Sequence, residues 1–288
     1  MTAILLKEFR SYLRGARPFT LLTVYMTLIS VLFMLVYAGG ASSPFTNRAS
    51  LGTQLFSFTV GLALLQLVFL APALNSSALG SERDRQTIDL LMITPLRRIM
   101  IILGKLIAPS IFLILLSIAV LPLGGLAFMI GGIEPRDLIV AFLLMVGTAL
   151  GYGSIGIWAA ARTRTSRGGT LMAQAICFML AIGIPFIGIF VVILLDNNNM
   201  LQDVMESFLR YPIFLIVSLS PFVGLFGWLG AIEGNRGSAW TLNLPAEMGG
   251  GTIPQFWILS LILWLIIVPL LLWRSARQLP KSLESHGG

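Results

Sequence analysis

The chain contains little charge and a single cysteine, and each scarcity excludes a class of protein. Only 11% of its 288 residues are charged, whereas soluble domains carry about a quarter. Because 57% of the residues are hydrophobic, the composition indicates an integral membrane protein. The only cysteine, Cys177, excludes an intrachain disulfide and a CxxC metal site. The only histidine, His286, lies in the polar C-terminal tail, away from the apolar runs.

Long apolar runs predict the number of membrane crossings. Six runs reach the roughly 20 residues that a helix needs to cross a bilayer. They are residues 19–40, 52–79, 104–130, 138–161, 170–195 and 254–273. A further apolar run, 211–232, is broken by Pro212 and Pro221, which predicts a re-entrant or helix-turn-helix element within an outer segment, 196–253. We therefore expect an all-α membrane protein with six transmembrane helices in a single domain over residues 1–288.

The distribution of basic residues predicts the orientation. With six spans and a cytoplasmic N-terminus, 15 of the 19 lysines and arginines fall in inner segments, whereas seven of the 12 acids fall outside. Membrane proteins keep basic residues in cytoplasmic loops, so both termini are expected to be cytoplasmic. This bias accounts for the net charge of +7 without nucleic acid as a partner.

The first residues form a basic amphipathic pattern. On a helical wheel over residues 3–17, Phe9 and Leu13 share an apolar face, while Lys7, Arg10 and Arg14 lie opposite. Such a helix lies in the headgroup plane and is attracted to anionic lipid of the inner leaflet. The pattern is also compatible with a simple topology anchor.

A polar segment, residues 81–105, interrupts the apolar runs. Ser81 and Asp84 have capping-box spacing, which predicts a helix start, and Pro95 predicts its end. Arg85 and Asp89 are spaced for an i,i+4 ion pair. Ile88, Leu91 and Met92 add a short apolar ridge. A short helix on the inner face with an exposed ridge favours docking of a partner protein, although such ridges also lie on lipid.

These residues resemble a known family. Glu82, Thr87, Ile88, Asp89, Leu90, Leu91, Thr94, Pro95, Leu96, Arg97, Gly104 and Lys105 are similar to the "E…GT(L/I)(E/D)LL…TPL…GK" stretch of type 2 ABC transporter permeases of the exporter class. Gln86 stands where that family commonly has glycine. The resemblance implies a connecting helix over 1–17 and a coupling helix over 81–98 that docks on an ABC ATP-binding subunit. The implied docking positions are Glu82, Arg85, Thr87, Asp89, Leu90 and Leu91.

The resemblance also implies partners. The sequence contains no GxxxxGK[ST] phosphate loop, so ATP and Mg²⁺ are expected in a partner ATPase subunit and no cofactor in this chain. A six-span unit resembles half of a transporter, which implies a second permease copy or a related permease. The expected role is export of an unidentified substrate across a bacterial-type cytoplasmic membrane.

Two other functions fit the sequence less well. A stand-alone secondary transporter or channel usually carries charged residues at mid-depth and an inverted repeat, and neither is visible here. An intramembrane hydrolase would need a base near Ser154 of the Gly151-Tyr-Gly-Ser154 stretch, but His286 lies in the tail. Small residues in the 138–161 run, with Gly151, Gly153 and Gly156 on one face, predict close helix packing.

Overall fold

A computed structural model describes residues 16–41, 48–84, 98–163, 165–197, 210–233, 241–243 and 252–278. These ranges contain six helices that are long and apolar enough to cross a membrane. They are α2 (Ala16–Ala41), α3 (Arg48–Asp84), α5 (Arg98–Ile130), α6 (Pro135–Arg162), the continuous helix made of α7 (Ser166–Phe178), η1 (Met179–Gly183) and α8 (Ile184–Asn197), and α12 (Phe256–Gln278). The predicted all-α class with six spans is confirmed.

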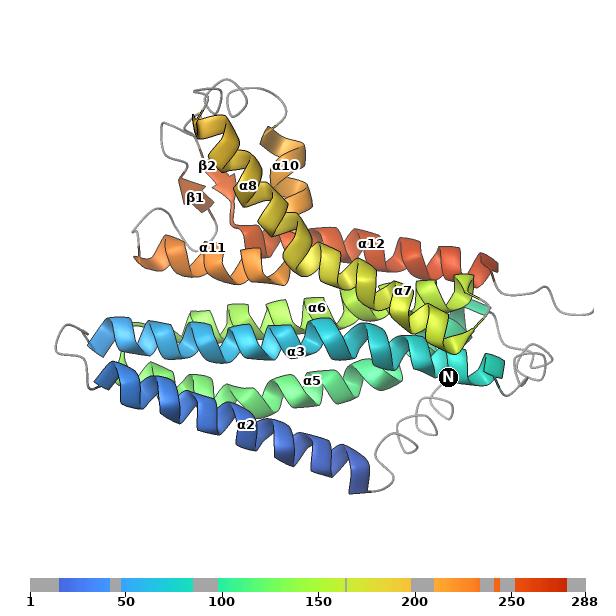
Figure 1. The fold of residues 1–288 in the computed structure, drawn as a ribbon, viewed down its shortest axis with the longest axis horizontal. Helices are drawn as coiled ribbons and strands as arrows, with labels where there is room; N and C mark the ends of the chain where they lie inside the picture. The colour runs from blue at the N-terminus through green and yellow to red at the C-terminus, as the bar shows by residue number, and fades with distance from the viewer. Residues whose placement is uncertain are drawn as a thin grey trace, which may run out of the picture.

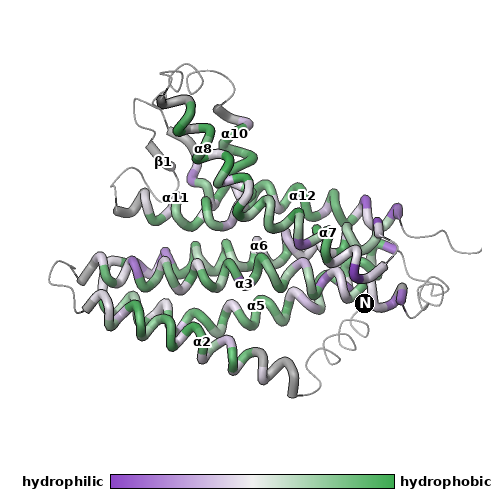
Figure 2. Tube along the Cα trace, viewed as in Figure 1, coloured by the Kyte–Doolittle hydropathy of each residue, from purple (hydrophilic) through white to green (hydrophobic). Residues whose placement is uncertain are grey.

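Three of these helices form the core. Helices α3, α5 and α6 run side by side through the bundle, with α2 on one flank and α12 on the other (Figure 1). At least half of the most apolar part of each core helix is buried, whereas only 11% is buried in α2 and in the α7–α8 helix. The end at which α3, α6 and α12 finish is called the inner end here, after the charge-based prediction. Hydrophilic residues gather there in Figure 2, at the ends of α3 and α12 and the start of α7.

A glycine turn at the outer end brings α5 back into α6. Gly131 and Gly132 have φ angles of 114° and 84°, a region that glycine reaches without steric strain. Pro135 then occupies the first turn of α6, where a missing backbone N–H is tolerated. The Asp137 carboxylate accepts a hydrogen bond of 2.7 Å from the backbone N–H of Glu134, which satisfies a free donor at the helix start.

A π-helical turn, η1, divides the fifth span. Opposite it, helices α10 (Arg210–Val217) and α11 (Pro221–Glu233) meet at a turn over 218–220. The Ser220 hydroxyl donates a hydrogen bond of 2.7 Å to the carbonyl oxygen of Ala181 within η1. The α10–α11 pair is a helix-turn-helix element at the site expected for one, and its re-entrant path stays a prediction.

A two-stranded sheet departs from the wholly helical expectation. Strands β1 (Thr241–Asn243) and β2 (Thr252–Pro254) pair antiparallel, with Leu242 opposite Ile253. Gln255, just after β2, is fully buried, and its side-chain amide donates to the carbonyl oxygen of Thr241 at 3.3 Å. The pair therefore fixes the chain immediately before α12.

Small residues of α6 allow close packing, as predicted, but toward two neighbours. A Cβ atom on Gly151 would overlap the ring of Trp264 in α12. A Cβ on Gly153 would lie 2.7 Å from the Asn75 amide nitrogen of α3, and one on Gly156 would lie 2.6 Å from the Pro72 carbonyl oxygen. The expectation that the three glycines share one face is wrong, because α6 is enclosed by α3 and α12 on different sides.

Candidate coupling site at the inner end

The inner ends of four helices converge on a small hydrophobic cluster, separate from the main core. It is called the inner cluster here, and its buried members are Leu79, Ile102, Leu106, Ile157, Ala160, Ala161 and Leu272. They come from α3, α5, α6 and α12, in that order. Because helix α3 ends at residue 84 and α5 begins at residue 98, the inner cluster packs directly beside both attachment points of the predicted coupling segment.

An ion pair between a buried lysine and a partly buried glutamate joins α3 to α5 at the inner end. The Lys105 ammonium lies 3.1 Å from a carboxylate oxygen of Glu82 and donates a hydrogen bond of 2.9 Å to the carbonyl oxygen of Ala78. The Lys105 side chain is only 5% exposed and that of Glu82 is 25% exposed. A cation beside the C-terminal turn of α3 also interacts favourably with the negative end of the helix dipole.

The structure changes the expected start of the polar segment. Ser81 to Asp84 form the last turn of α3, so the predicted helix start at Ser81 is wrong. The capping-box spacing misleads because a Ser-x-x-Asp sequence can equally complete a helix whose hydrogen bonds continue from the preceding span. Of the predicted docking positions, only Glu82 falls in the described residues.

The remaining predicted positions lie outside the described residues. For the coupling helix these are Arg85, Thr87, Asp89, Leu90 and Leu91. For the interfacial helix they are Lys7, Phe9, Arg10 and Arg14. Their roles stay predictions.

The second inner turn, between α6 and α7, packs closely against α3. A Cβ on Gly80 would lie 2.5 Å from the Ser166 hydroxyl oxygen, so α3 and the start of α7 nearly touch. The Thr170 hydroxyl donates to the Ser76 hydroxyl at 3.3 Å. At the start of α7, the Thr165 hydroxyl accepts a hydrogen bond from the backbone N–H of Gly168. A displacement of the end of α3 would therefore act on α7 as well as on α5.

Arginines stack on tryptophans at the inner end. The Arg277 guanidinium lies 3.6 Å from the centre of the exposed Trp273 ring, and that of Arg162 lies 5.8 Å from the centre of Trp158. Such pairs suit the headgroup region, where one part of the side chain is wet and the other apolar. Trp257, near the start of α12, is only 7% exposed and packs edge-on against Trp228.

A second polar cluster lies at the outer end. Asp137 at the start of α6 is buried, and the half-exposed Arg136 guanidinium lies 3.0 Å from the Glu134 carboxylate and 3.8 Å from that of Asp137. The same guanidinium lies 5.8 Å from the centre of the Trp228 ring on α11. This cluster ties the helix-turn-helix element to the start of α6.

No catalytic arrangement is visible at Ser154. Its side chain is fully buried, and its hydroxyl donates to the carbonyl oxygen of Gly151, one turn earlier in α6. A hydroxyl held in this way by its own helix is not presented to a substrate. Within the part of the chain that the structure describes, no three His, Cys, Asp or Glu side chains come together as metal ligands.

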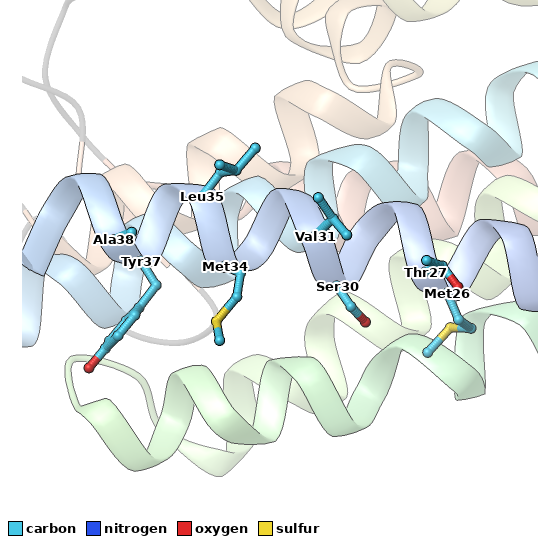
Figure 3. A pocket seen from close by; sticks show the side chains of 8 residues that line it. All are labelled: Met26, Thr27, Ser30, Val31, Met34, Leu35, Tyr37 and Ala38. Atoms are coloured by element: carbon cyan, nitrogen blue, oxygen red, sulfur yellow. The ribbon is translucent and has the colours of Figure 1, made fainter.

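Two apolar depressions in the described surface lie on the α2 side. Figure 3 shows one of them, lined by residues between Met26 and Ala38 that all belong to α2. A second, of about 480 Å³, lies between α2, α3 and α11 and includes Gln54, Phe58 and Phe226. The first is the surface of one helix and not an enclosed cavity.

Among the described residues, the lysine, arginine, aspartate and glutamate side chains lie at or near the helix ends. Together with the six spans, this arrangement defines a multi-pass membrane protein. The family of ABC-2 family transporter proteins matches residues 2–273, nearly the whole chain. The chain belongs to this family: it is a membrane-spanning permease of an ABC transporter and not itself an enzyme. Permeases of this family normally work with an ATP-binding subunit. A comparison with curated proteins gives no match.

Proposed function

We propose that this permease is the membrane subunit of an ATP-driven exporter in a cytoplasmic membrane, and that a separate subunit binds and hydrolyses ATP. The observation that supports the proposal best is the construction of the inner end. The segment 85–97 is attached to α3 and α5, two core helices, and both attachment points adjoin the inner cluster. A partner that pushes on this segment would act on the centre of the bundle.

The proposed docking positions are those of the coupling helix, residues Arg85, Thr87, Asp89, Leu90 and Leu91. The short apolar ridge would enter a groove of the ATP-binding subunit, as amphipathic helices do, and the charged residues would set its orientation. The amphipathic segment 1–17 would lie on the inner leaflet beside it, bound through Lys7, Arg10 and Arg14 to anionic lipid.

A double substitution in the ridge tests the docking. We expect Asp89→Ala combined with Leu91→Ala to weaken co-purification with the ATP-binding subunit by about tenfold or more, because a buried interface anchor contributes about 2 kcal/mol. The control is Ile139→Ala, since Ile139 is an exposed apolar residue at the opposite end. If the Asp89/Leu91 variant binds and activates the ATPase like the wild type, docking at this segment is wrong.

We further propose that a second permease copy packs against α2. This helix is the least covered of the spans together with the fifth, and its exposed face includes Val31, Met34 and Tyr37. The same face carries the hydroxyls of Thr27 and Ser30. Hydroxyl groups are common where transmembrane helices pack against each other, because they allow close approach.

Cysteine cross-linking tests this arrangement. In a Cys177→Ser background, we expect at least one of Val31→Cys, Met34→Cys and Tyr37→Cys to form a disulfide-linked dimer in native membranes. The control is Ile266→Cys on α12, since its side chain is 60% exposed and that of Met34 is 67% exposed. A cross-link at Ile266 and none along α2 would place the second copy elsewhere.

A further inference from the structure

The ion pair of Glu82 with Lys105 joins the two helices that flank the predicted coupling segment. Glu82 lies two residues before the last residue of α3, and Lys105 lies seven residues after the first residue of α5. At 1.5 Å per residue, Lys105 is about 10 Å inside the first residue of α5. The ion pair therefore closes a loop that contains the entire coupling segment. Lys105 is the first buried charge after that segment among the described residues, and its partner Glu82 is partly buried.

The environment of the pair makes it sensitive to separation. Lys105 is buried, and its ammonium also donates to the Ala78 carbonyl oxygen within α3. Charges withdrawn from water depend on their partners much more than charges at an exposed surface, because water no longer compensates for a lost contact. The exposed Asp84, half a turn further along α3, has no comparable burial.

The ion pair lies next to residues of the inner cluster. Leu79 of α3 and Leu106 of α5, each close to a member of the pair in sequence, both belong to the inner cluster with residues of α6 and α12. With the pair intact, the ends of α3 and α5 form one body over this cluster. Without it, either helix end could shift alone.

We propose that Glu82 and Lys105 are positioning residues that make both ends of the coupling segment move together, so that movement of the ATP-binding subunit reaches the core. In this role the Glu82 carboxylate holds Lys105 instead of contacting the ATP-binding subunit. The proposal rests on the proposed function, since it requires a partner that docks between the two helices.

The test measures MgATP hydrolysis by the permease and its ATP-binding subunit, purified together in lipid nanodiscs. We expect Glu82→Gln and Lys105→Met each to lower the permease-dependent kcat about tenfold, within the usual range of coupling between sites, while KM for ATP and co-purification stay unchanged. The conservative variant Lys105→Arg, which keeps the cation and a donor for the Ala78 carbonyl oxygen, should keep kcat at least threefold above that of Lys105→Met. The matched control, Asp84→Asn, should hydrolyse ATP like the wild type.

The outcomes separate positioning from other roles. A purely structural contact would reduce the amount of folded complex but leave kcat per complex at the wild-type value, which would overturn the proposal. Loss of co-purification in Glu82→Gln but not in Lys105→Met would make Glu82 a docking residue and would also overturn it. If Lys105→Met does not fold, Glu82→Gln decides, because a wild-type kcat in that variant contradicts the proposal. A wild-type chain that binds no ATP-binding subunit would instead refute the proposed function itself.

Discussion

Gly52→Ala is expected to prevent α3 from packing against the glycine turn between α5 and α6. A Cβ atom at this position would overlap the carbonyl oxygen of Gly131 and would lie 3.0 Å from that of Ala127. Both obstacles are backbone atoms, so no side-chain rotation can relieve the contact. The turn cannot simply withdraw, because the Thr53 hydroxyl donates a hydrogen bond of 3.2 Å to the carbonyl oxygen of Gly132.

We expect a loss of about 3 kcal/mol or more in unfolding free energy, at the upper end of the effects of overpacking. The melting temperature of the purified protein in detergent should fall by roughly 5–10 °C. Gly61→Ala is the matched control, since it lies in the same helix and a Cβ there would meet no atom within 4 Å. Equal melting temperatures for the two variants would show that α3 and the glycine turn are further apart than described.

Gly156→Ala is expected to separate the two most central helices, α3 and α6. A Cβ atom on Gly156 would lie 2.6 Å from the Pro72 carbonyl oxygen and 3.1 Å from both the Pro72 Cα and the Ser76 backbone nitrogen. All three atoms belong to the α3 backbone. Accommodating a methyl group therefore requires movement of a whole helix in a closely packed core, at a cost of about 2–3 kcal/mol.

The effect should extend to function, because the contact of Gly156 with Pro72 and Ser76 lies close to the place where α3 meets the α6–α7 turn. We expect a melting temperature about 5 °C or more below that of the wild type. We also expect a lower rate of permease-stimulated ATP hydrolysis. Gly125→Ala in α5 is the control, because open space surrounds the added methyl group. Since alanine favours helices more than glycine, this control should be neutral or slightly stabilising. A Gly156→Ala protein as stable as Gly125→Ala would contradict the described α3–α6 contact.

Hydropathy alone predicts the six spans because a run of about 20 uncharged residues has few alternatives to a membrane helix. It does not predict where the helices end. Helix α3 continues to Asp84 although its apolar run ends near residue 79, because backbone hydrogen bonds continue irrespective of side-chain polarity. For the same reason the polar residues Ser81 and Glu82 belong to α3 and not to a separate helix.

Contacts between helices could not be predicted from one sequence. The glycines of α6 indicate close packing, but the neighbour that each one faces depends on how α3 and α12 are rotated about their axes. The pairing of Glu82 with Lys105, 23 residues apart, depends likewise on how α3 and α5 are placed side by side. Sequence resemblance marks both residues, yet assigns only Glu82 a role, at a docking surface.

The contact between Ser220 and η1 was equally invisible to sequence patterns. Nothing in the Met179–Gly183 stretch distinguishes a π turn from an ordinary helix, and a single serine before Pro221 reads as part of a turn. The structure connects the two because the Ala181 carbonyl oxygen, within the widened turn, is within reach of the Ser220 hydroxyl.

The π turn also changes the directions in which the side chains of the fifth span point around the helix axis. Each inserted residue advances the helix by about 100°, so a helical wheel drawn continuously from Ser166 assigns every side chain after Gly183 to a direction that is wrong by that amount. Leu171 in α7 and Phe186 in α8, exposed by 70% and 71%, must therefore be placed on two separate wheels. Labels or cross-linkers intended for one side of this span should be chosen with the numbering restarted at Ile184.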